Sequence, residues 1–198
     1  MICVDLHSHT LMSQCGIHTH LEMLNAARDR GLAGLAITDH GPALQGRLPS
    51  PVYERLDQPL PGIRLIKGIE ANVTDAEGAV DVPAWLLPML DIVLLGLHVK
   101  FPRSRNDADW TEAMLTAIRR NPWVDLITHP VDENFPMDIE RLAVAAKALG
   151  IALELNNSKV LYKRTSPERV RRFLDICRET GCRIAVCSDA HTVSEIGG

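Results

Sequence analysis

The sequence lacks the marks of a secreted or membrane-spanning protein. It contains five cysteines, an odd number, and no C-x-x-C motif, which favours free thiols in a reducing compartment over a disulfide framework. Asp5, His7 and His9 interrupt the N-terminal segment in which a signal peptide needs an apolar run. The most apolar stretch, residues 85–97, contains a proline and an aspartate and is too short to span a membrane. We therefore predict a cytoplasmic protein with no membrane partner.

An excess of basic or aromatic residues is also missing. The formal net charge is −4, and aromatic side chains make up 4% of the residues. Nucleic-acid binding relies on basic patches and stacking surfaces, so the composition disfavours a nucleic-acid partner. A hydrophobic share of 46% and a length of 198 residues suit a single domain over residues 1–198 with its own core. The sequence does not indicate an oligomeric state.

What the sequence does contain is a regular alternation of β-type and helical patterns. Short apolar runs predict strands at residues 2–7, 34–38, 64–70, 91–98, 124–128, 151–155 and 183–187. Capping residues and apolar spacing predict helices at residues 19–30, 109–120, 138–149 and 166–180. Residues 41–62, rich in proline and glycine, are predicted to form a loop or a short irregular insert. Strands that alternate with helices form parallel sheets, here either an open sheet or a distorted barrel.

Histidines and acidic residues cluster where the predicted strands end. Six of the eight histidines lie at or just after such an end: His7, His9, His40, His98, His129 and His191. Glu70 ends the third strand, and Asp189 follows the seventh. Strand ends make up about a tenth of such a chain, so chance would place about one histidine there. Because parallel strands bring their C-terminal ends to one face, we predict that these side chains meet in one site.

Spacing within the clusters supports a common direction. Side chains two residues apart in a strand point to the same side, as do His7 with His9 and Asp189 with His191. Asp5 has the same phase, one layer deeper, and is expected to orient a ligand from behind. A lone histidine at a strand end is usually a hydrogen-bonded polar residue. So many buried polar groups would lack partners without metal, which favours a metal site.

Asp39 and His40 are adjacent, so their side chains are expected to point in different directions. We assign His40 to a metal ion, and Asp39 to a hydrogen bond or a proton transfer. Imidazole and carboxylate ligands together suit Zn, Mn or Fe. The candidate ligands outnumber those of one ion, so two or three divalent ions are predicted.

Six motifs stand in order along the chain: Asp5-Leu6-His7-Ser8-His9-Thr10, Ile37-Thr38-Asp39-His40-Gly41, Gly68-Ile69-Glu70-Ala71-Asn72, Gly96-Leu97-His98, Thr128-His129-Pro130 and Ser188-Asp189-Ala190-His191. Together they resemble the PHP family (polymerase and histidinol phosphatase), and most closely its small stand-alone phosphatase branch. The resemblance covers nearly the whole chain. It implies an α/β fold, a distorted (βα)7 TIM-like barrel, with a trinuclear metal site and phosphoesterase activity.

The resemblance also implies roles for individual residues. The metal ligands would be His7, His9, His40, Glu70, His98, His129, Asp189 and His191. Metal ions of this kind supply a metal-activated hydroxide near neutral pH and hold the oxygens of a small phosphomonoester. The predicted catalytic residues are Asp39, His40 and Asp189. A protein nucleophile is not needed, and the sequence has no G-x-S-x-G motif.

The chain departs from the family pattern in two places. The branch usually has a further histidine ligand in the loop after the first strand, where this chain has Ser13-Gln14-Cys15-Gly16-Ile17-His18. Either Cys15 or His18 is expected to take this role, and a thiolate would favour Zn. The sequence also stops soon after the last ligand pair, so the final helix of the family is expected to be missing. The outer face of the seventh strand would then be exposed or covered by a partner.

A phosphate group needs cationic partners. Arg103 and Lys159 follow predicted strands on the side of the site and are candidates for substrate binding. Each alone is more commonly a solvated surface charge. Asn157 at the end of the sixth strand is a third candidate, unless it merely terminates the strand.

Two other functions stay open. An amidohydrolase-type C–N hydrolase shares the H-x-H strand and a final aspartate, but it often needs a carboxylated lysine. No lysine ends a middle strand here, which argues against this alternative. A non-catalytic, metal-stabilised scaffold would need only part of the ligand set, and the nearly complete set argues against it.

Overall fold

A computed structural model describes residues 2–56, 60–99 and 107–198 of the chain. Its seven strands form one sheet in which neighbours follow in chain order and every pair is parallel. The strands are β1 (Val4–Asp5), β2 (Gly34–Ile37), β3 (Arg64–Asn72), β4 (Ile92–Gly96), β5 (Leu126–Ile127), β6 (Ala152–Asn156) and β7 (Ile184–Cys187).

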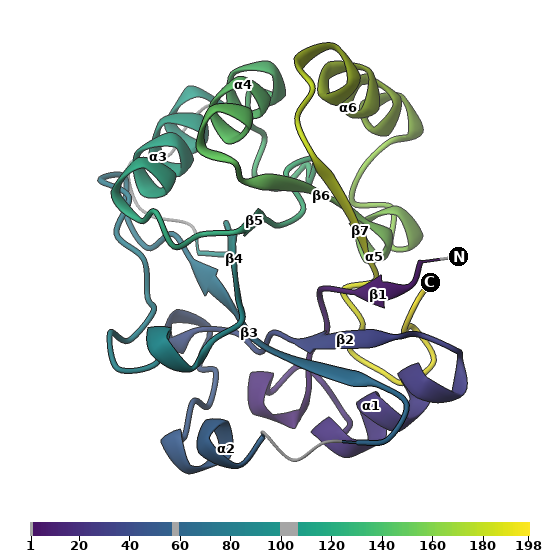
Figure 1. The fold of residues 1–198 in the computed structure, drawn as a ribbon. Helices are drawn as coiled ribbons and strands as arrows, with labels where there is room; N and C mark the ends of the chain where they lie inside the picture. The colour runs from purple at the N-terminus through teal and green to yellow at the C-terminus, as the bar shows by residue number, and fades with distance from the viewer. Residues whose placement is uncertain (1, 57–59, 100–106) are drawn as a thin grey trace.

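The first and last strands meet just beyond their ends, so the sheet is a nearly closed barrel (Figure 1). Ser8 and Ala190 form a parallel bridge. The N–H of His9 donates to the carbonyl of Ala190 at 2.8 Å, and the N–H of Asp189 donates to the carbonyl of His7 at 3.0 Å. The predicted barrel is therefore confirmed over the open sheet.

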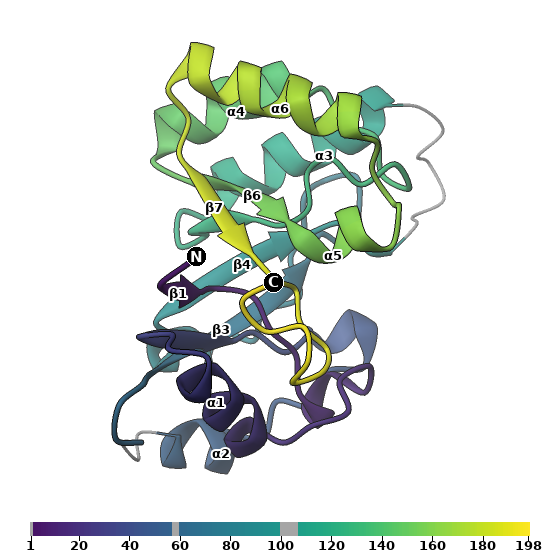
Figure 2. The same ribbon diagram turned by 90° about the vertical axis from the view of Figure 1, so that its right-hand side faces the viewer.

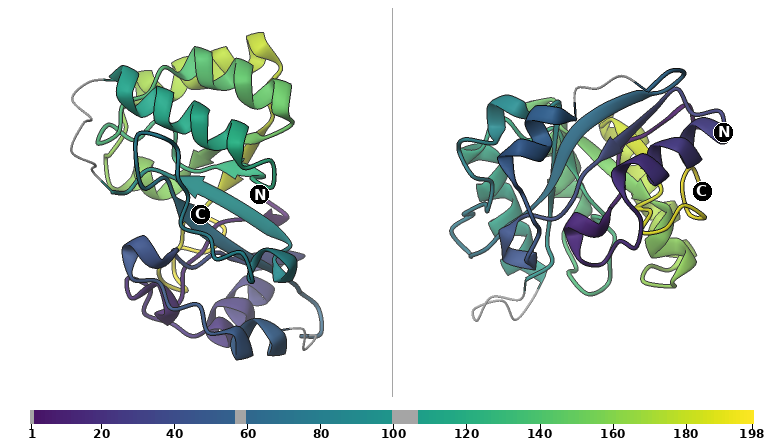
Figure 3. Two further views of the ribbon diagram at one scale, coloured as in Figure 1. Left: turned by 90° about the vertical axis from the view of Figure 1, so that its left-hand side faces the viewer. Right: turned by 90° about the horizontal axis from the view of Figure 1, so that it is seen from below.

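Helices cover the outside of the barrel: α1 (His20–Asp29), α2 (Ser50–Arg55), α3 (Asp107–Arg120), α4 (Ile139–Leu149), α5 (Asn157–Leu161) and α6 (Pro167–Thr180). Figure 2 and Figure 3 show α3, α4 and α6 together on one side and α1 with α2 on the opposite side. Short 3-10 turns occur at Leu11–Ser13, Pro42–Leu44 and Leu87–Met89. Within the described residues, no helix is both long and apolar enough to cross a membrane.

All four predicted long helices are present, and α3 begins two residues earlier than predicted. Local capping chemistry explains the ends of the other three. The Thr19 hydroxyl accepts the N–H of Glu22, and the Glu22 carboxylate accepts the N–H of Thr19 in a capping box. At the start of α6 the Ser166 hydroxyl accepts the N–H of Arg169, and a proline follows at the first helical position. Gly150 and Gly181 end α4 and α6 with left-handed φ values of 73° and 69°, which glycine adopts without steric cost.

Two short helices were not predicted, and one predicted strand is much shorter. α2 falls inside residues 41–62, predicted as a loop or irregular insert. α5 begins directly after β6, because the side chain of Asn156 accepts the N–H of Lys159 at 2.9 Å and caps a new helix. β1 holds only two residues of the predicted 2–7, since from Ser8 onward the chain bridges to the segment after β7.

Side chains alternate across the barrel wall. Outward residues such as Ile69, Leu95 and Leu153 pack in one core cluster with Met114 of α3 and Phe173 of α6. A small cluster made only of strand residues and their neighbours fills the inside: Leu94, Leu126 and Cys187. Nearer the C-terminal strand ends the inward positions become polar, and this is where the predicted site lies.

The outer face of β7 is less covered than the rest of the barrel. In the part of the chain that the structure describes, no helix follows β7. Ile184 and Val186 on its outer face are 37% and 43% exposed, as expected for a strand without a covering helix. Residues 188–198 form turns, and the N–H of Gly197 donates to Asp5 at 3.1 Å.

Candidate metal centre

Glu70, near the end of β3, lies at the centre of a cluster of imidazoles. Its side chain is 1% exposed. Five ring nitrogens lie within 3.4 Å of its carboxylate oxygens, from His7, His9, His40, His98 and His129. Burial alone would raise the pKa of this carboxyl, but the surrounding histidines outweigh burial and hold it well below its usual range. The centre therefore carries a buried carboxylate anion.

Asp189, two residues after β7, supplies the second carboxylate. Its Oδ1 lies 3.2 Å from Nε2 of His9 and 3.4 Å from Nε2 of His7, while its Oδ2 accepts from the ammonium of Lys159 at 3.0 Å. Asp189 and His129 have left-handed φ values of 55° and 33°, a region that non-glycine residues rarely occupy. Such backbone strain concentrates at functional sites, where the fold holds a side chain in a required direction.

Three overlapping groups of side chains have ligand atoms within 4.8 Å of one another: His7, His9 and Asp189; His40, Glu70 and His98; and His9, Cys15, His40 and His191. Cys15 thus lies with the predicted ligands, whereas His18 belongs to none of these groups within the described residues. The Nδ1 of His18 instead accepts the N–H of Val193 at 3.4 Å. Burial raises the pKa of the Cys15 thiol, but hydrogen bonds with His191 and His40 outweigh it and lower the pKa to about 6.

Hydrogen bonds behind the rings determine which nitrogen faces the centre. Nδ1 of His7 lies 2.7 Å from the Glu154 carboxylate, which can only accept, so this nitrogen carries the proton. The Ser13 hydroxyl donates to Asp39 at 2.6 Å and therefore accepts from Nδ1 of His9 at 2.9 Å. In both rings Nε2 is therefore the nitrogen that points to the centre.

His98 is oriented in the same manner. The amide nitrogen of Asn72 donates to Asp81 at 2.7 Å, so the Asn72 oxygen faces Nδ1 of His98 at 2.8 Å and accepts from it. Burial is the main reason that the pKa of His98 falls to about 4, which keeps the ring neutral. A neutral imidazole with a free Nε2 is the form that binds metal.

The donor set fits divalent cations. Nε2 of His7 lies 3.0 Å from Nε2 of His9, and Nε2 of His98 lies 3.0 Å from Nε2 of His129. Two imidazole nitrogens at this distance need a proton or a metal cation between them, because facing lone pairs repel. Nδ1 of His40 is 2.9 Å from Glu70 but lacks hydrogen-bond alignment, and it is buried without a hydrogen-bond partner among the described residues. An orphaned nitrogen of this kind is explained by a bound ion.

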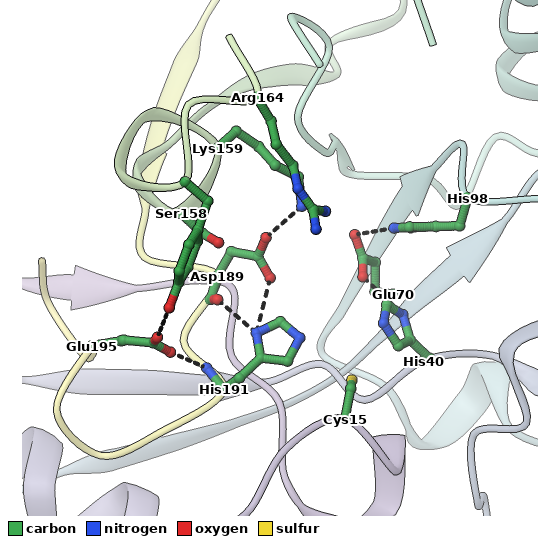
Figure 4. A pocket seen from close by; sticks show the side chains of 11 residues that line it. Cys15, His40, Glu70, His98, Ser158, Lys159, Arg164, Asp189, His191 and Glu195 are labelled. Carbon is green, nitrogen blue, oxygen red and sulfur yellow. Dashed lines mark hydrogen bonds and ion pairs between the residues drawn. The ribbon is translucent and has the colours of Figure 1, made fainter. Parts of the chain in front are cut away.

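A cavity of about 410 Å³ opens onto the cluster (Figure 4), lined by Cys15, His40, Glu70, His98, Ser158, Lys159, Tyr162, Arg164, Asp189, His191 and Glu195. Lys159 and Arg164 both point into it beside Asp189. Burial disfavours the charged form of Lys159, but the carboxylates of Asp189 and Glu70 outweigh burial and raise its pKa. Two cations thus lie next to a set of metal-ligating side chains.

The sequence model described as PHP domain matches residues 5–129 of this chain. The chain belongs to the PHP domain family. The predicted family is therefore confirmed, and the match contains the predicted ligands from His7 to His129, whereas Asp189 and His191 lie beyond it.

Relatives of this PHP domain cover almost its whole length. A probable phosphatase of Acetivibrio thermocellus is 38% identical over 197 residues, which is 98% of this chain and 81% of the relative. A probable phosphatase of Shewanella sp. strain ANA-3 is 37% identical over 203 residues, covering 98% of this chain and 79% of the relative. These relatives bear out the predicted enzyme class, a PHP-family hydrolase.

A solved structure supports the PHP fold. Histidinol phosphate phosphatase from Lactococcus lactis, complexed with zinc, L-histidinol and phosphate, matches with a TM-score of 0.68. The match covers 96% of this chain and 86% of that protein at 15% identity. At this identity the likeness concerns the fold, and it agrees with the nearly closed barrel of seven parallel strands.

The PHP site uses several residues that the sequence interpretation did not assign. Glu154 of β6 is fully buried, and it accepts both from the ring of His7 and from the backbone N–H of His129 at 2.6 Å. A charged residue in the middle of an apolar strand, two positions before Asn156, is a signal that could have revealed it. Ser13 and Arg164 carried no comparable signal, since each lies in a polar or loop segment, whereas Asn72 ends β3 two positions after Glu70 and has the same spacing signal.

Two aspartates of the PHP site hold the backbone and the loop after β1. Asp39 accepts from the N–H and the hydroxyl of Thr10 at 2.7 and 2.8 Å and from the hydroxyl of Ser13. Of the two predicted roles for Asp39, this geometry matches the hydrogen bond. Asp5 accepts the N–H of Ser188 at 3.0 Å. Asp5 also accepts the backbone N–H of His7 at 3.4 Å, while Glu154 reaches the ring of His7 from β6. The role of Asp5 in orienting a ligand stays a prediction.

The three predicted substrate residues differ in where the structure places them. Arg103 lies outside the described residues. Asn157 is the first residue of α5 and does not line the cavity. The neighbouring Asn156 points to the site instead, where its amide donates to Asp189 at 3.2 Å. Lys159 lines the cavity, and its role in substrate binding stays a prediction.

Proposed function

We propose that this PHP domain is a metal-dependent phosphatase that hydrolyses a small phosphomonoester. The observation that carries the proposal is the convergence of imidazoles, carboxylates and two cations on one cavity of about 410 Å³. This volume lies within the usual range of small-molecule sites. The description of the relatives as probable phosphatases supports the same activity.

The ligand groups suggest how two or three ions of Zn, Mn or Fe would be held. Because one imidazole nitrogen binds one ion, the overlapping groups divide into three positions. We assign His7, His9 and Asp189 to the first position, His98 and His129 to the second, and Cys15, His40 and His191 to the third. The Glu70 carboxylate lies within 3.4 Å of a histidine from each position. This division needs no contribution from His18. The zinc present in the related histidinol phosphate phosphatase supports divalent ions in such a barrel.

Bound divalent ions supply an activated water and neutralise charge on the phosphoryl group. The chain itself contributes the cations that bind and orient the phosphoryl oxygens, Lys159 and Arg164. Asp189 fixes the ammonium of Lys159 at 3.0 Å and so links phosphate binding to the ligand set. Asp39 is proposed as a positioning residue, since it holds the hydroxyl of Ser13 and thereby the ring of His9.

We propose that the substrate is the phosphate ester of a small polar alcohol. The rim of the cavity is polar and internally bonded. Glu195 accepts the hydroxyl of Tyr162 at 2.8 Å and the N–H of His191 at 2.7 Å. Such a rim favours a compact polar leaving group over a long apolar chain. Arg103 and Asn157 stay predictions for substrate binding. Arg164 is proposed as the second cation, beside Lys159, that binds the phosphate.

The proposal is tested with purified protein loaded in turn with Zn²⁺ and Mn²⁺. The protein is expected to release phosphate from p-nitrophenyl phosphate and from some members of a panel of small phosphomonoesters. His129→Ala and Asp189→Ala are expected to abolish this release, while Arg171→Gln on the exposed face of α6 should leave it unchanged. No turnover across the panel, with bound metal shown by elemental analysis, would overturn the proposal.

Two outcomes would favour the alternatives. Hydrolysis of cyclic amides without phosphate release would indicate an amidohydrolase-type activity. A lower melting temperature in both variants, with every measured activity unchanged, would indicate a metal-stabilised scaffold.

A further inference from the structure

One of the three groups of ligand atoms contains sulfur. The thiol of Cys15 and ring nitrogens of His9, His40 and His191 lie within 4.8 Å of one another. Figure 4 shows Cys15 pointing into the space between His40 and His191. The other two groups offer only nitrogen and oxygen atoms. One group of candidate ligands therefore includes a thiol, and the other two do not.

The backbone fixes the position of Cys15. The 3-10 turn Leu11–Ser13 precedes it, and Gln14 has a left-handed φ of 62°. Gly16 follows at a point where a Cβ would lie 2.5 Å from the carbonyl oxygen of Thr10, so no larger residue fits. The N–H of Ile17 then donates to the carbonyl of His191 at 3.1 Å. This bond ties the cysteine loop to the segment that carries one of the neighbouring histidines.

Packing does not explain this cysteine. Cys177 and Cys182 belong to the apolar core that includes α6, and Cys187 belongs to the small cluster inside the barrel. Cys15 belongs to none of the apolar clusters of the described residues. It is exposed toward the cavity and has histidines as its neighbours.

We infer that Cys15, His40 and His191 form a sulfur-containing ion position that holds Zn²⁺ in preference to Mn²⁺. Thiolate and imidazole are the usual ligands of tetrahedral Zn²⁺, whereas Mn²⁺ prefers carboxylate and water. Nδ1 of His40 is buried without an aligned hydrogen-bond partner among the described residues and lies 2.9 Å from the Glu70 carboxylate, so His40 can bind a cation beside this position. The remaining positions contain no sulfur and accept Mn²⁺ or Fe²⁺ as well. The inference rests on the proposed metal dependence but not on phosphate hydrolysis.

The test uses Co²⁺ as a spectroscopic probe for Zn²⁺ in the full chain. The Co²⁺-loaded protein is expected to show a thiolate-to-cobalt charge-transfer band in the near ultraviolet. The band should be lost in Cys15→Ser and retained in Cys3→Ser, which changes the other exposed cysteine. X-ray absorption of the Zn²⁺-loaded protein should show one sulfur scatterer at about 2.3 Å, absent from Cys15→Ser.

Competition between metals gives the functional consequence. With excess Mn²⁺ the protein is expected to retain one Zn²⁺ per chain. Cys15→Ser should lower this preference by more than about tenfold, since even changes around a ligand weaken metal binding by that factor. Cys15→His should keep the ion count but lack the band, which separates loss of sulfur from loss of the position. Circular dichroism confirms that each variant is folded.

The outcomes separate this inference from the proposed activity. A band lost only in Cys15→Ser supports the sulfur position, even if the protein hydrolyses no phosphate ester. A folded, metal-loaded protein without the band, or with equal zinc preference in Cys15→Ser, overturns the inference even if the protein is an active phosphatase.

Discussion

The two halves of the metal centre are built in different ways. The inner half consists of side chains at or beside strand ends. His7, His9, Glu70, His129 and Asp189 are at most 4% exposed, and the side chain of His98 is 15% exposed. The outer half consists of Cys15, His40 and His191. Cys15 is exposed, and the side chain of His191 is 29% exposed.

The support of each half differs as well. Inner imidazoles are held through their second ring nitrogen by buried side chains, Glu154 behind His7 and Ser13 behind His9. The outer half is held mainly by backbone contacts, such as the bond from Ile17 to His191. The barrel therefore fixes the geometry of the inner half, while the outer half depends on loops. A loop can exchange one ligand type for another more readily than a packed strand end can.

The largest effect is expected from removing the shared carboxylate. Glu70→Gln keeps the shape of the side chain but takes away the charge that lies within 3.4 Å of five imidazole nitrogens. We expect kcat/KM for phosphate release to fall by about a thousandfold or more, with loss of bound metal. Metal content and steady-state kinetics measure both effects.

Glu112→Gln is the control for this change, because Glu112 is half-exposed on α3 and pairs with Arg141, away from the metal centre. If Glu70→Gln kept its full metal content and a kcat/KM within about threefold of the unchanged protein, Glu70 would not be the shared ligand of both halves.

A smaller effect is expected from changing a residue that holds the ligands in place without binding metal itself. Glu154→Gln removes the carboxylate that holds Nδ1 of His7 at 2.7 Å and the N–H of His129 at 2.6 Å. We expect metal affinity to fall by about 10- to 100-fold, the usual result of losing such support. Competition with a chelator measures it, and Glu140→Gln on exposed α4 is the control. Unchanged affinity would mean that the inner half does not depend on its buried support.

The sequence alone was enough to predict what depends on local rules. Helix caps such as Thr19 and Ser166, together with apolar spacing, predicted the four long helices, and the alternation of strands and helices predicted the parallel sheet. The choice of a barrel over an open sheet came from the family resemblance. The convergence of histidines followed from the parallel direction of the strands. These features need only the chain neighbours of each residue and the direction of each strand.

Features that depend on distant segments were not predicted. Glu154 supports His7 across 147 residues of chain, and no local pattern joins the two. The choice between Cys15 and His18 depends on how the loop folds against the segment after β7, which the order of residues does not specify. The role of Asn156 as the cap of α5 was also missed, because an asparagine pair after a strand resembles a simple strand end.

A glycine pair tests how tightly the inner half is packed. A Cβ at Gly96 would lie 2.5 Å from Oγ1 of Thr128 and 2.6 Å from Cε1 of His98, whereas a Cβ at Gly34 would meet nothing closer than 3.4 Å. We expect Gly96→Ala to destabilise the fold by about 1–3 kcal/mol and to lower metal affinity by about tenfold. Gly34→Ala should do neither. Thermal denaturation and chelator competition decide, and equal behaviour of the two variants would contradict the close packing.

The smallest effect is expected at the cavity mouth, outside both halves of the metal centre. Arg164 is exposed and points into the cavity beside Lys159. Arg164→Gln should therefore raise KM for a phosphomonoester by about 3- to 10-fold, because one charge-assisted contact to phosphate is lost. Metal content and kcat should change little, as in the control Arg171→Gln. A fall in bound metal with KM unchanged would contradict this prediction. Arg164 would then support the ligands of the outer half and would not be a substrate contact.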